Sequence, residues 1–213
     1  RMKDSGVEWL GEVPEHWEVG QLRHVISHAS NGTTETQVDP TVETVSVSRI
    51  ETISDGYINF NKTGALEFRS ELENFRINEG DILFSHINSL PMIGNCALYQ
   101  NEKPLYHGMN LLRLVPAKNI VSRWLEFWLK SIIVRQDMEA SAKPAINQAS
   151  ISTAALKSRP VLIPPPAEQA EIADQIDQSL HELSGLINSA KNLVSLLQER
   201  RSALISAAVT GKI

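Results

Sequence analysis

Cysteine is almost absent from this chain, and its scarcity excludes two common ways of stabilising or equipping a small protein. Cys96 is the only cysteine in 213 residues, so the chain can form neither an internal disulfide nor a zinc site built on several cysteines. No apolar run is long enough to cross a bilayer, and the polar start, residues 1–9, lacks a signal-peptide core. These absences predict a protein of the reducing cytoplasm with no membrane partner.

Recognisable catalytic motifs are missing as well. The sequence contains no glycine-rich phosphate loop. The prolines of 164–166 lack both the acid or amide and the aromatic residue that would complete an adenine-methyltransferase tetrapeptide. His24 and His28 have the spacing of two metal ligands on a helix, but no third ligand is evident. We therefore expect no catalytic residue, no metal and no cofactor on this chain.

Charge is scarce overall but unevenly distributed. The formal net charge is −5, which argues weakly against a general nucleic-acid-binding protein. Residues 1–102 contain seven Lys or Arg against sixteen Asp or Glu, whereas residues 103–165 contain nine against three. Two interpretations remain open: a local DNA-facing surface in the basic segment, or mutual neutralisation of the two segments in the fold.

The pattern of the first 163 residues predicts a globular α+β (mixed α/β) domain. A helix is expected over Val121–Met138, where Trp124, Leu125 and Trp128 recur at helical spacing. Trp9 and Trp17 are candidate buried anchors near the N-terminus. Alternating or apolar runs next to turn residues predict strands at Thr44–Ile50, Tyr57–Phe60, Ile82–Ser85, Asn95–Tyr99, Asn110–Val115 and Pro160–Ile163.

Residues 164–213 predict a second element, one long helix that continues to about Ala208. Three prolines separate it from the domain, and proline is tolerated in the first turn of a helix. About 42 helical residues would span about 60 Å. A heptad seam with a single gap at Arg201 predicts pairing with a partner helix, with packing along the chain's own domain as the alternative. The seam consists of Ile176, Leu180, Leu183, Ile187, Ala190, Val194, Leu197 and Leu204.

Several segments resemble the DNA-specificity subunits of Type I restriction-modification systems. Three of these are the opening run KDSGVEWLGEVPEHW at 3–17, the run GDILFS at 80–85, and residues 147–169, which include PPPAEQ. The last is RSALISAAVTGKI at 201–213. The Gly-Asp run alone is a weak signal, but the two ends and the proline-rich exit are specific to the family when taken together.

This resemblance implies a non-catalytic subunit whose target recognition domain, here residues 1–163, reads one half of a split site in double-stranded DNA. It also implies that long helices pair in an antiparallel coiled coil, which sets the distance between two such domains. Adenine methyltransferase subunits, which use S-adenosylmethionine, would dock on this scaffold, and a translocating restriction nuclease subunit would join them. The family usually has two domains and two helices in one chain. The single set here predicts either a half-subunit that forms a homodimer or a fragment of a longer subunit.

Candidate DNA-contacting residues follow from the chemistry of base and phosphate recognition, which uses Arg, Lys, Asn, Gln, Ser and Thr. The family counterpart of segment 140–149 lies near the recognition surface, and here that segment contains no acid. The candidates are Lys143, Asn147, Gln148, Ser85, His86, Asn88, Arg49, Lys62 and Arg69. Two other hypotheses stay open. A coiled-coil adaptor would not bind duplex DNA even with methyltransferase subunits present, and an enzyme would show activity as the purified chain.

Overall fold

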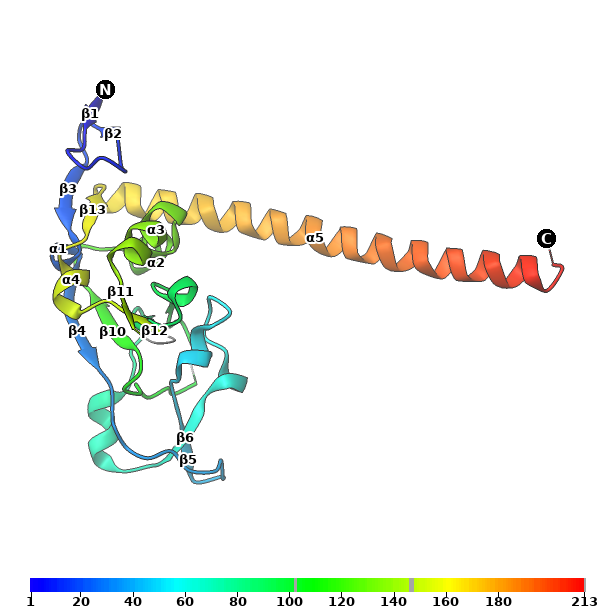
Figure 1. Cartoon of the computed structure of the whole chain (residues 1–213), viewed down its shortest axis with the longest axis horizontal. Coiled ribbons are helices and arrows are strands. Elements are labelled where there is room, and N and C mark those ends of the chain that lie inside the picture. The colour runs from blue at the N-terminus through cyan, green and yellow to red at the C-terminus, as the bar shows by residue number, and fades with distance from the viewer. Residues whose placement is uncertain (102, 146–147, 213) are drawn as a thin grey trace. The chain divides into compact units, whose positions relative to one another are not determined.

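The structure, a computed structural model, describes residues 1–101, 103–145 and 148–212 (Figure 1). The chain divides into two compact units, Arg1–Ala170 and Glu171–Ile213. The first contains small antiparallel sheets and short helices, and the second consists mainly of one long helix. The predicted fold class, a mixed α/β domain followed by a long C-terminal helix, is thus confirmed. Asn147 lies outside the described residues.

The largest sheet among the described residues is antiparallel, with the strand order β4-β10-β7-β9. Strand β7 (Ile82–Phe84) is fully buried, because it pairs on both sides and all three of its side chains are apolar. Its neighbours are β10 (Leu112–Pro116) and β9 (Cys96–Leu98), and β4 (Ile26–Asn31) pairs with the other edge of β10. Gly80, with φ +89°, makes the turn into β7 that few other residues could adopt.

Apolar side chains from this sheet and from the segments around it form the core. One cluster gathers residues from β7, β9 and neighbouring loops: Ile53, Ile77, Leu83, Ala97, Tyr99, Leu105 and Leu111. A second, smaller cluster includes residues of the hairpin formed by β5 (Thr44–Val47) and β6 (Gly64–Glu67): Val47, Leu66, Leu72 and Tyr106. Both clusters therefore combine apolar residues from several separate segments of the sequence.

Smaller antiparallel pairings complete the domain. They are β1 (Met2–Asp4) with β2 (Glu12–Pro14), β3 (Glu18–Gln21) with β13 (Pro160–Ile163), and β12 (Gln148–Ser150) with both β11 (Lys143–Ala145) and β8 (Ile87–Asn88). Two of them, β3 with β13 and β12 with β8, join segments that are distant in the sequence. The short helical segments are α1 (Leu22–Val25), α4 (Thr153–Lys157), η1 (Ile50–Ile53), η2 (Phe60–Lys62), η3 (Ser70–Phe75) and η4 (Leu90–Met92). The β3–β13 pair closes the domain, because it joins a strand near the N-terminus to the last strand of the chain.

One sequence prediction about a single element is confirmed with an interruption, and another is wrong. The helix predicted over Val121–Met138 is two helices, α2 (Ser122–Lys130) and α3 (Ile132–Ser141). Ser131 separates them, because its backbone is extended (φ −60°, ψ 143°) and its hydroxyl donates to the Trp128 carbonyl. The strand predicted at Tyr57–Phe60 is irregular and leads into η2, because the Asn59 side chain accepts a hydrogen bond from the Asn61 N–H and caps that turn.

The long helix α5 (Pro166–Val209) begins at the third proline and ends close to the predicted residue. Proline at this position costs nothing in hydrogen bonds, because the first N–H groups of a helix have no intrahelical partner. Within the described ranges, no helix combines the length and the apolar character needed to cross a membrane. Trp9 and Trp17, expected as buried anchors, are half-buried.

Candidate nucleic-acid interface

A small sheet of three strands brings two of the predicted DNA-contacting residues together. β12 lies between β11 and β8, with Lys143 opposite Ser150, Ala145 opposite Gln148 and Ser150 opposite Ile87. Directly opposed residues share a face of a sheet, and side chains along a strand alternate between faces. Lys143, Gln148, Ser150 and Ile87 therefore lie on one face. Lys143, Gln148 and Ile87 are exposed there, which gives a surface with one cation, one amide and one apolar side chain.

Three further candidates support this sheet from beneath. Asn88 lies opposite the buried Ala149, so its side chain belongs to the other face. Its amide donates to the Ser85 hydroxyl, 3.1 Å away, and Ser85 is fully buried. His86 is 6% exposed, and its carbonyl accepts a hydrogen bond from the Ile151 N–H. Ser85, His86 and Asn88 hold β8 in place in this structure, and the side chains of Ser85 and His86 are buried.

Burial lowers the pKa of two histidines in this domain, His86 and His107. It lowers the pKa of His86, whose Nδ1 has no hydrogen-bond partner among the described residues. It also lowers the pKa of His107 to about 4, against a smaller opposing effect of the hydrogen bond between His107 Nε2 and the Leu111 carbonyl. His86 therefore contributes no charge for phosphate binding at neutral pH.

Because of His107, we expect the folded protein to lose stability on mild acidification. Because its folded-state pKa of about 4 lies below the ordinary 6.5, the unfolded chain takes up the proton first as the pH falls. The contribution is present above pH 6.5 and is lost toward pH 4. We expect the free energy of unfolding to fall by about 2 kcal/mol between pH 7 and pH 5 through this group, measured by urea denaturation. His107→Gln should flatten the slope, and exposed His181→Gln should not; equal slopes in all three proteins would contradict the assignment.

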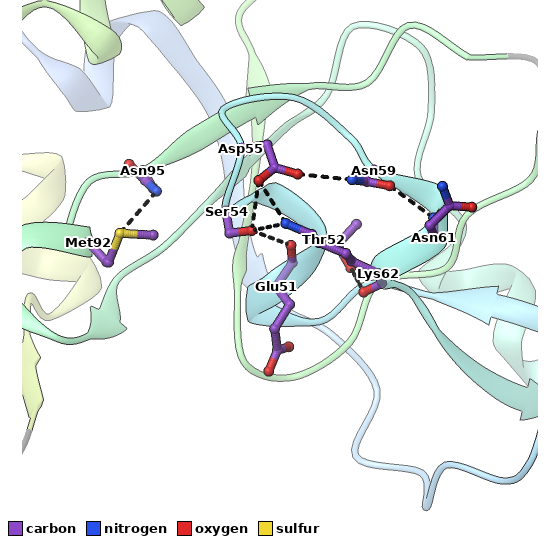
Figure 2. Close-up of polar contacts among 9 residues, drawn as sticks. All are labelled: Glu51, Thr52, Ser54, Asp55, Asn59, Asn61, Lys62, Met92 and Asn95. Carbon is purple, nitrogen blue, oxygen red and sulfur yellow. Dashed lines mark hydrogen bonds and ion pairs between the residues drawn. The ribbon is translucent and has the colours of Figure 1, made fainter. Parts of the chain in front are cut away.

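The remaining cationic candidates lie on other elements, and each has a carboxylate beside it. Lys62 Nζ donates to Asp55 Oδ1 (2.7 Å) and to the Ser54 hydroxyl (3.0 Å), and Asn59 donates to the other carboxylate oxygen of Asp55 (Figure 2). These bonds, that of Lys62 first, hold the pKa of Asp55 below its ordinary value. The network ties η1 to η2, so Lys62 has a structural partner in the free protein.

Arg49 and Arg69 are more loosely paired. Arg49 Nε lies 3.5 Å from Glu51, and Arg69 Nη2 lies 3.6 Å from Glu67, with all four side chains largely exposed. Such surface pairs contribute little to stability and separate easily. Arg49 and Lys62 line one surface depression, whereas Arg69 lines another with Glu67. The structure therefore does not join these three cations to the sheet that contains Lys143 and Gln148.

Sequence analysis missed the residues that shape the loop next to β8. Arg135 of α3 donates to the Asn95 side chain and to the Pro91 carbonyl (2.7 Å), which anchors η4. The Asn95 amide also contacts Met92 Sδ at 3.7 Å (Figure 2). Gly94 turns there with φ +79°, close to the Arg135 side chain. In the sequence, Arg135 has the pattern of an ordinary cation on a helix surface. No local pattern could therefore have identified it as the residue that anchors this loop.

Much of the basic character of segment 103–165 is neutralised within the fold. Arg113 crosses to Asp81 of the acidic segment, but the other neutralising acids belong to the basic segment itself. The pairs are Arg113–Asp81, Lys130–Glu126, Arg135–Glu139 and Arg159–Asp137. In the described part of the chain, Lys143, Lys157 and Lys118 have no ion pair. Lys143 is therefore a cation available to a phosphate.

Cys96 and the possible metal ligands are candidate sites of chemistry among the residues that the structure describes. Cys96 is fully buried in β9, and burial raises the pKa of its thiol to about 12, so the nucleophilic thiolate is suppressed. Among the residues that the structure describes, no three His, Cys, Asp or Glu side chains are grouped to hold a metal ion.

The predicted heptad seam lies along one side of α5. Its large residues are about half exposed: Leu180, Leu183, Ile187, Val194, Leu197 and Leu204. Ala190 is exposed as well, and Ile176, nearer the start, is half-buried. A repeat of this kind on an exposed helix is typical of a coiled-coil partner surface.

Comparison with known proteins identifies a family and relatives that are similar to this chain. The family model described as the Type I restriction modification DNA specificity domain matches residues 14–194. A Methanocaldococcus jannaschii protein, assigned as the specificity subunit of the type I restriction enzyme MjaX, is 35% identical over 205 residues. That match covers 94% of this chain and 47% of the relative. The EcoKI specificity subunit of Escherichia coli K12 is 28% identical over 172 residues, 78% of this chain and 37% of its own length.

Solved structures show the same fold at low sequence identity. A chain from a study of assembly and conformational transition in the type I R-M system has a TM-score of 0.69 at 16% identity. It covers 97% of this chain and 48% of its own length. The HsdS subunit of Thermoanaerobacter tengcongensis has a TM-score of 0.60 at 15% identity, with 88% and 42% covered. The chain spans about half the length of the curated relatives that it matches, or less.

Proposed function

This chain belongs to the Type I restriction-modification DNA specificity family, and on that premise we propose that it recognises one half of a split target in double-stranded DNA. The observation that carries the proposal is the exposed face of the β11–β12–β8 sheet. Lys143 and Gln148 share this face, and Lys143 has no ion pair among the described residues. Lysine suits a phosphate, and glutamine can form two hydrogen bonds with adenine in the major groove.

The remaining candidates take graded roles in this proposal. The exposed face of the β11–β12–β8 sheet, with Lys143 and Gln148, is called the reading face. Ser85, His86 and Asn88 support it, because Ser85 and His86 are buried and Asn88 is bonded to Ser85. Arg49, Lys62 and Arg69 reach phosphates only if they leave the nearby carboxylates, which the exposed arginine pairs can do at small cost. Residues 1–163 would form the target recognition domain, and residues 164–213 the spacer helix.

The spacer helix would set the distance between two recognition domains. Its 44 residues correspond to about 65 Å, which is close to two turns of B-DNA at about 34 Å each. Antiparallel pairing with a second such helix would place one domain at each end. If the partner is a second copy of this chain, two-fold symmetry requires a palindromic gapped site. If the second helix belongs to a longer form of the same subunit, the two halves of the site can differ.

The apolar surface of α5 is wide enough for more than one partner. Leu186 and Leu193, which are 69% and 58% exposed, lie beside the seam and widen it. A seam widened on one flank is typical of helices in bundles, whereas a two-stranded coiled coil needs only the narrow seam. This flank would receive the adenine methyltransferase subunits, which hold S-adenosylmethionine. A restriction nuclease subunit would join the assembly in the cytoplasm.

The family consists of specificity subunits, which are not catalytic. Methylation and cleavage would therefore reside on partner subunits, and this chain would supply recognition and geometry. The buried Cys96 is in keeping with that division, because its thiol stays protonated. A coiled-coil adaptor without DNA binding is the alternative, favoured only by the extent of exposed apolar surface on α5.

Substitutions on the reading face should separate base recognition from phosphate binding. Gln148→Ala should lose about 1 to 3 kcal/mol of discrimination at one base pair. Lys143→Gln should weaken binding to all sequences and reduce the dependence of log affinity on log salt by about one. Fluorescence anisotropy of the assembled complex on labelled duplexes, at several salt concentrations, measures both. Lys118→Gln, which removes an exposed lysine outside this sheet, is the matched control; an equal effect there would argue against the assigned face.

The decisive experiment is co-expression with the neighbouring methyltransferase subunit, followed by single-molecule mapping of N6-methyladenine. A gapped motif is expected. A palindromic motif would indicate two copies of this chain, and an asymmetric motif a second, different domain. Absence of any new methylation by an assembled, folded complex would support the adaptor hypothesis instead.

A further inference from the structure

The first turn of α5 is tied to the recognition domain by two adjacent side chains, Glu168 and Gln169. The Glu168 carboxylate receives the Trp17 indole N–H (2.8 Å) on one oxygen and His16 Nε2 (2.7 Å) on the other. An ionised carboxylate only accepts hydrogen bonds, so His16 Nε2 is the donor here. These contacts, that of Trp17 first, lower the pKa of Glu168. The helix start is thereby joined to the segment that connects β2 to β3.

Gln169 makes the second connection from a fully buried position. Its side-chain oxygen accepts the backbone N–H of Val121 (2.8 Å), the residue that precedes α2, and its amide donates to the Pro164 carbonyl (2.8 Å). Both ends of the side chain are therefore engaged. We name Glu168 and Gln169, with the groups that they bind, the exit clamp.

The residues around the exit clamp leave little freedom of their own. Pro164, Pro165 and Pro166 have fixed φ angles, and α5 continues without interruption from Pro166 to Val209. Rotation at the exit would therefore have to break the hydrogen bonds of Glu168 and Gln169. A buried polar side chain with both groups paired is a specific constraint, because any other orientation leaves a donor and an acceptor unpaired.

We propose that the exit clamp is a specificity-determining device: Glu168 and Gln169 are positioning residues that make the gap between the two half-sites discrete. This inference rests on the proposed function and concerns how the protein fixes the length of the gap. A tilt of about 5° at the first turn would displace the end of a helix of about 65 Å by about 6 Å. One base pair of gap corresponds to only about 3.4 Å and about 34°. A recognition domain that could tilt freely at the exit would accept several gap lengths.

The test compares methylation by clamp variants in the assembled complex. Wild-type chain, Glu168→Ala, Gln169→Ala and Trp17→Phe are each co-expressed with the neighbouring methyltransferase subunit, and N6-methyladenine is mapped at single-molecule level. We expect unchanged half-site sequences. Sites whose gap is one base pair shorter or longer should be methylated about tenfold more than with the wild-type chain, equivalent to about 1.4 kcal/mol. Glu168→Gln keeps an acceptor for the Trp17 N–H and should stay close to the wild type.

Glu171→Ala is the matched control, since it removes an exposed glutamate one turn further along α5. A single gap in every clamp variant, as in the wild type, would overturn the inference while leaving the proposed function intact. Loss of methylation at every gap by variants that fold and assemble would also overturn it. Trp17→Phe, which removes one N–H and keeps most of the ring, covers the case in which the other variants fail to fold. If the wild-type chain itself yields no gapped motif, the proposed function fails first.

Discussion

Leu197→Asp in the middle of the α5 seam is expected to abolish association through this helix and to leave the globular domain folded. Each copy would place a carboxylate where an apolar contact is required, and burying a leucine contributes about 1.5 to 3 kcal/mol. Two copies in a symmetric pair lose about 3 to 6 kcal/mol, which weakens association about 10²- to 10⁴-fold. Leu183→Asp, two heptads earlier, should have the same effect. Light scattering of the purified chain and of its complex with methyltransferase subunits measures the assembly mass.

The matched control is Asn192→Asp, which adds the same charge on the side of the helix opposite the seam. It should leave the assembly mass unchanged. An unchanged mass for Leu183→Asp and Leu197→Asp as well would remove the seam from the proposed function. In all three variants, the free energy of unfolding of the globular unit, residues 1–170, should stay close to the wild-type value in urea. That result would show that the substitutions impair association and not folding.

Asp81→Ala is expected to destabilise the recognition domain by about 3 to 5 kcal/mol, because it leaves a buried guanidinium without its carboxylate. Arg113 Nε donates to Asp81 Oδ2 at 2.7 Å, and the two side chains are 14% and 4% exposed. The same oxygen accepts the Asn78 N–H, which stabilises the Gly80 turn before β7. Urea denaturation at neutral pH measures the loss.

The double variant Asp81→Ala with Arg113→Met separates the two components. Replacing both partners of a buried ion pair by apolar groups is often nearly neutral, so most of the stability should return. The lost Asn78 contact would account for the remaining deficit of about 1 kcal/mol. A double variant no more stable than Asp81→Ala would show that the turn, and not the unpaired charge, dominates. Lys130→Met provides a comparison at a less deeply buried pair.

The sequence predicts the long helix better than any other element of this protein. Prolines mark its start and a sustained heptad repeat marks its course, and both are local signals that need no knowledge of the fold. Strand β7 was predicted for a similar reason, since Gly80-Asp81 is followed by three apolar residues, all of them buried. The failures have tertiary or side-chain causes. The break at Ser131 depends on one hydroxyl bonding to a carbonyl, and helical periodicity continues across it.

The candidate site was predictable as a set of residues but not as a surface. Residue chemistry and the family resemblance selected Lys143 and Gln148, which the structure places on one face of a sheet. Asn88 was selected for the same reason but belongs to the opposite face, because it lies one residue along β8 from Ile87. The sequence could not show which side chains share a face with Lys143. The pairing of β8 with β12 joins segments about 60 residues apart, and no local pattern predicts it. Ile87 and Ser150 were missed for this reason.

The carboxylate of Glu126, which forms an ion pair with Lys130, also covers one edge of a sheet. Strand β9 is the edge of the largest described sheet, and its outward Leu98 N–H donates to Glu126 Oε1 at 3.0 Å, with Lys130 on the same oxygen. An unpaired edge invites another chain to add a strand, and here α2 occupies that edge. The covered edge disfavours strand addition at β9. A strand from another copy could pair there only if Glu126 released the Leu98 N–H, whereas the apolar seam of α5 is exposed without any such change.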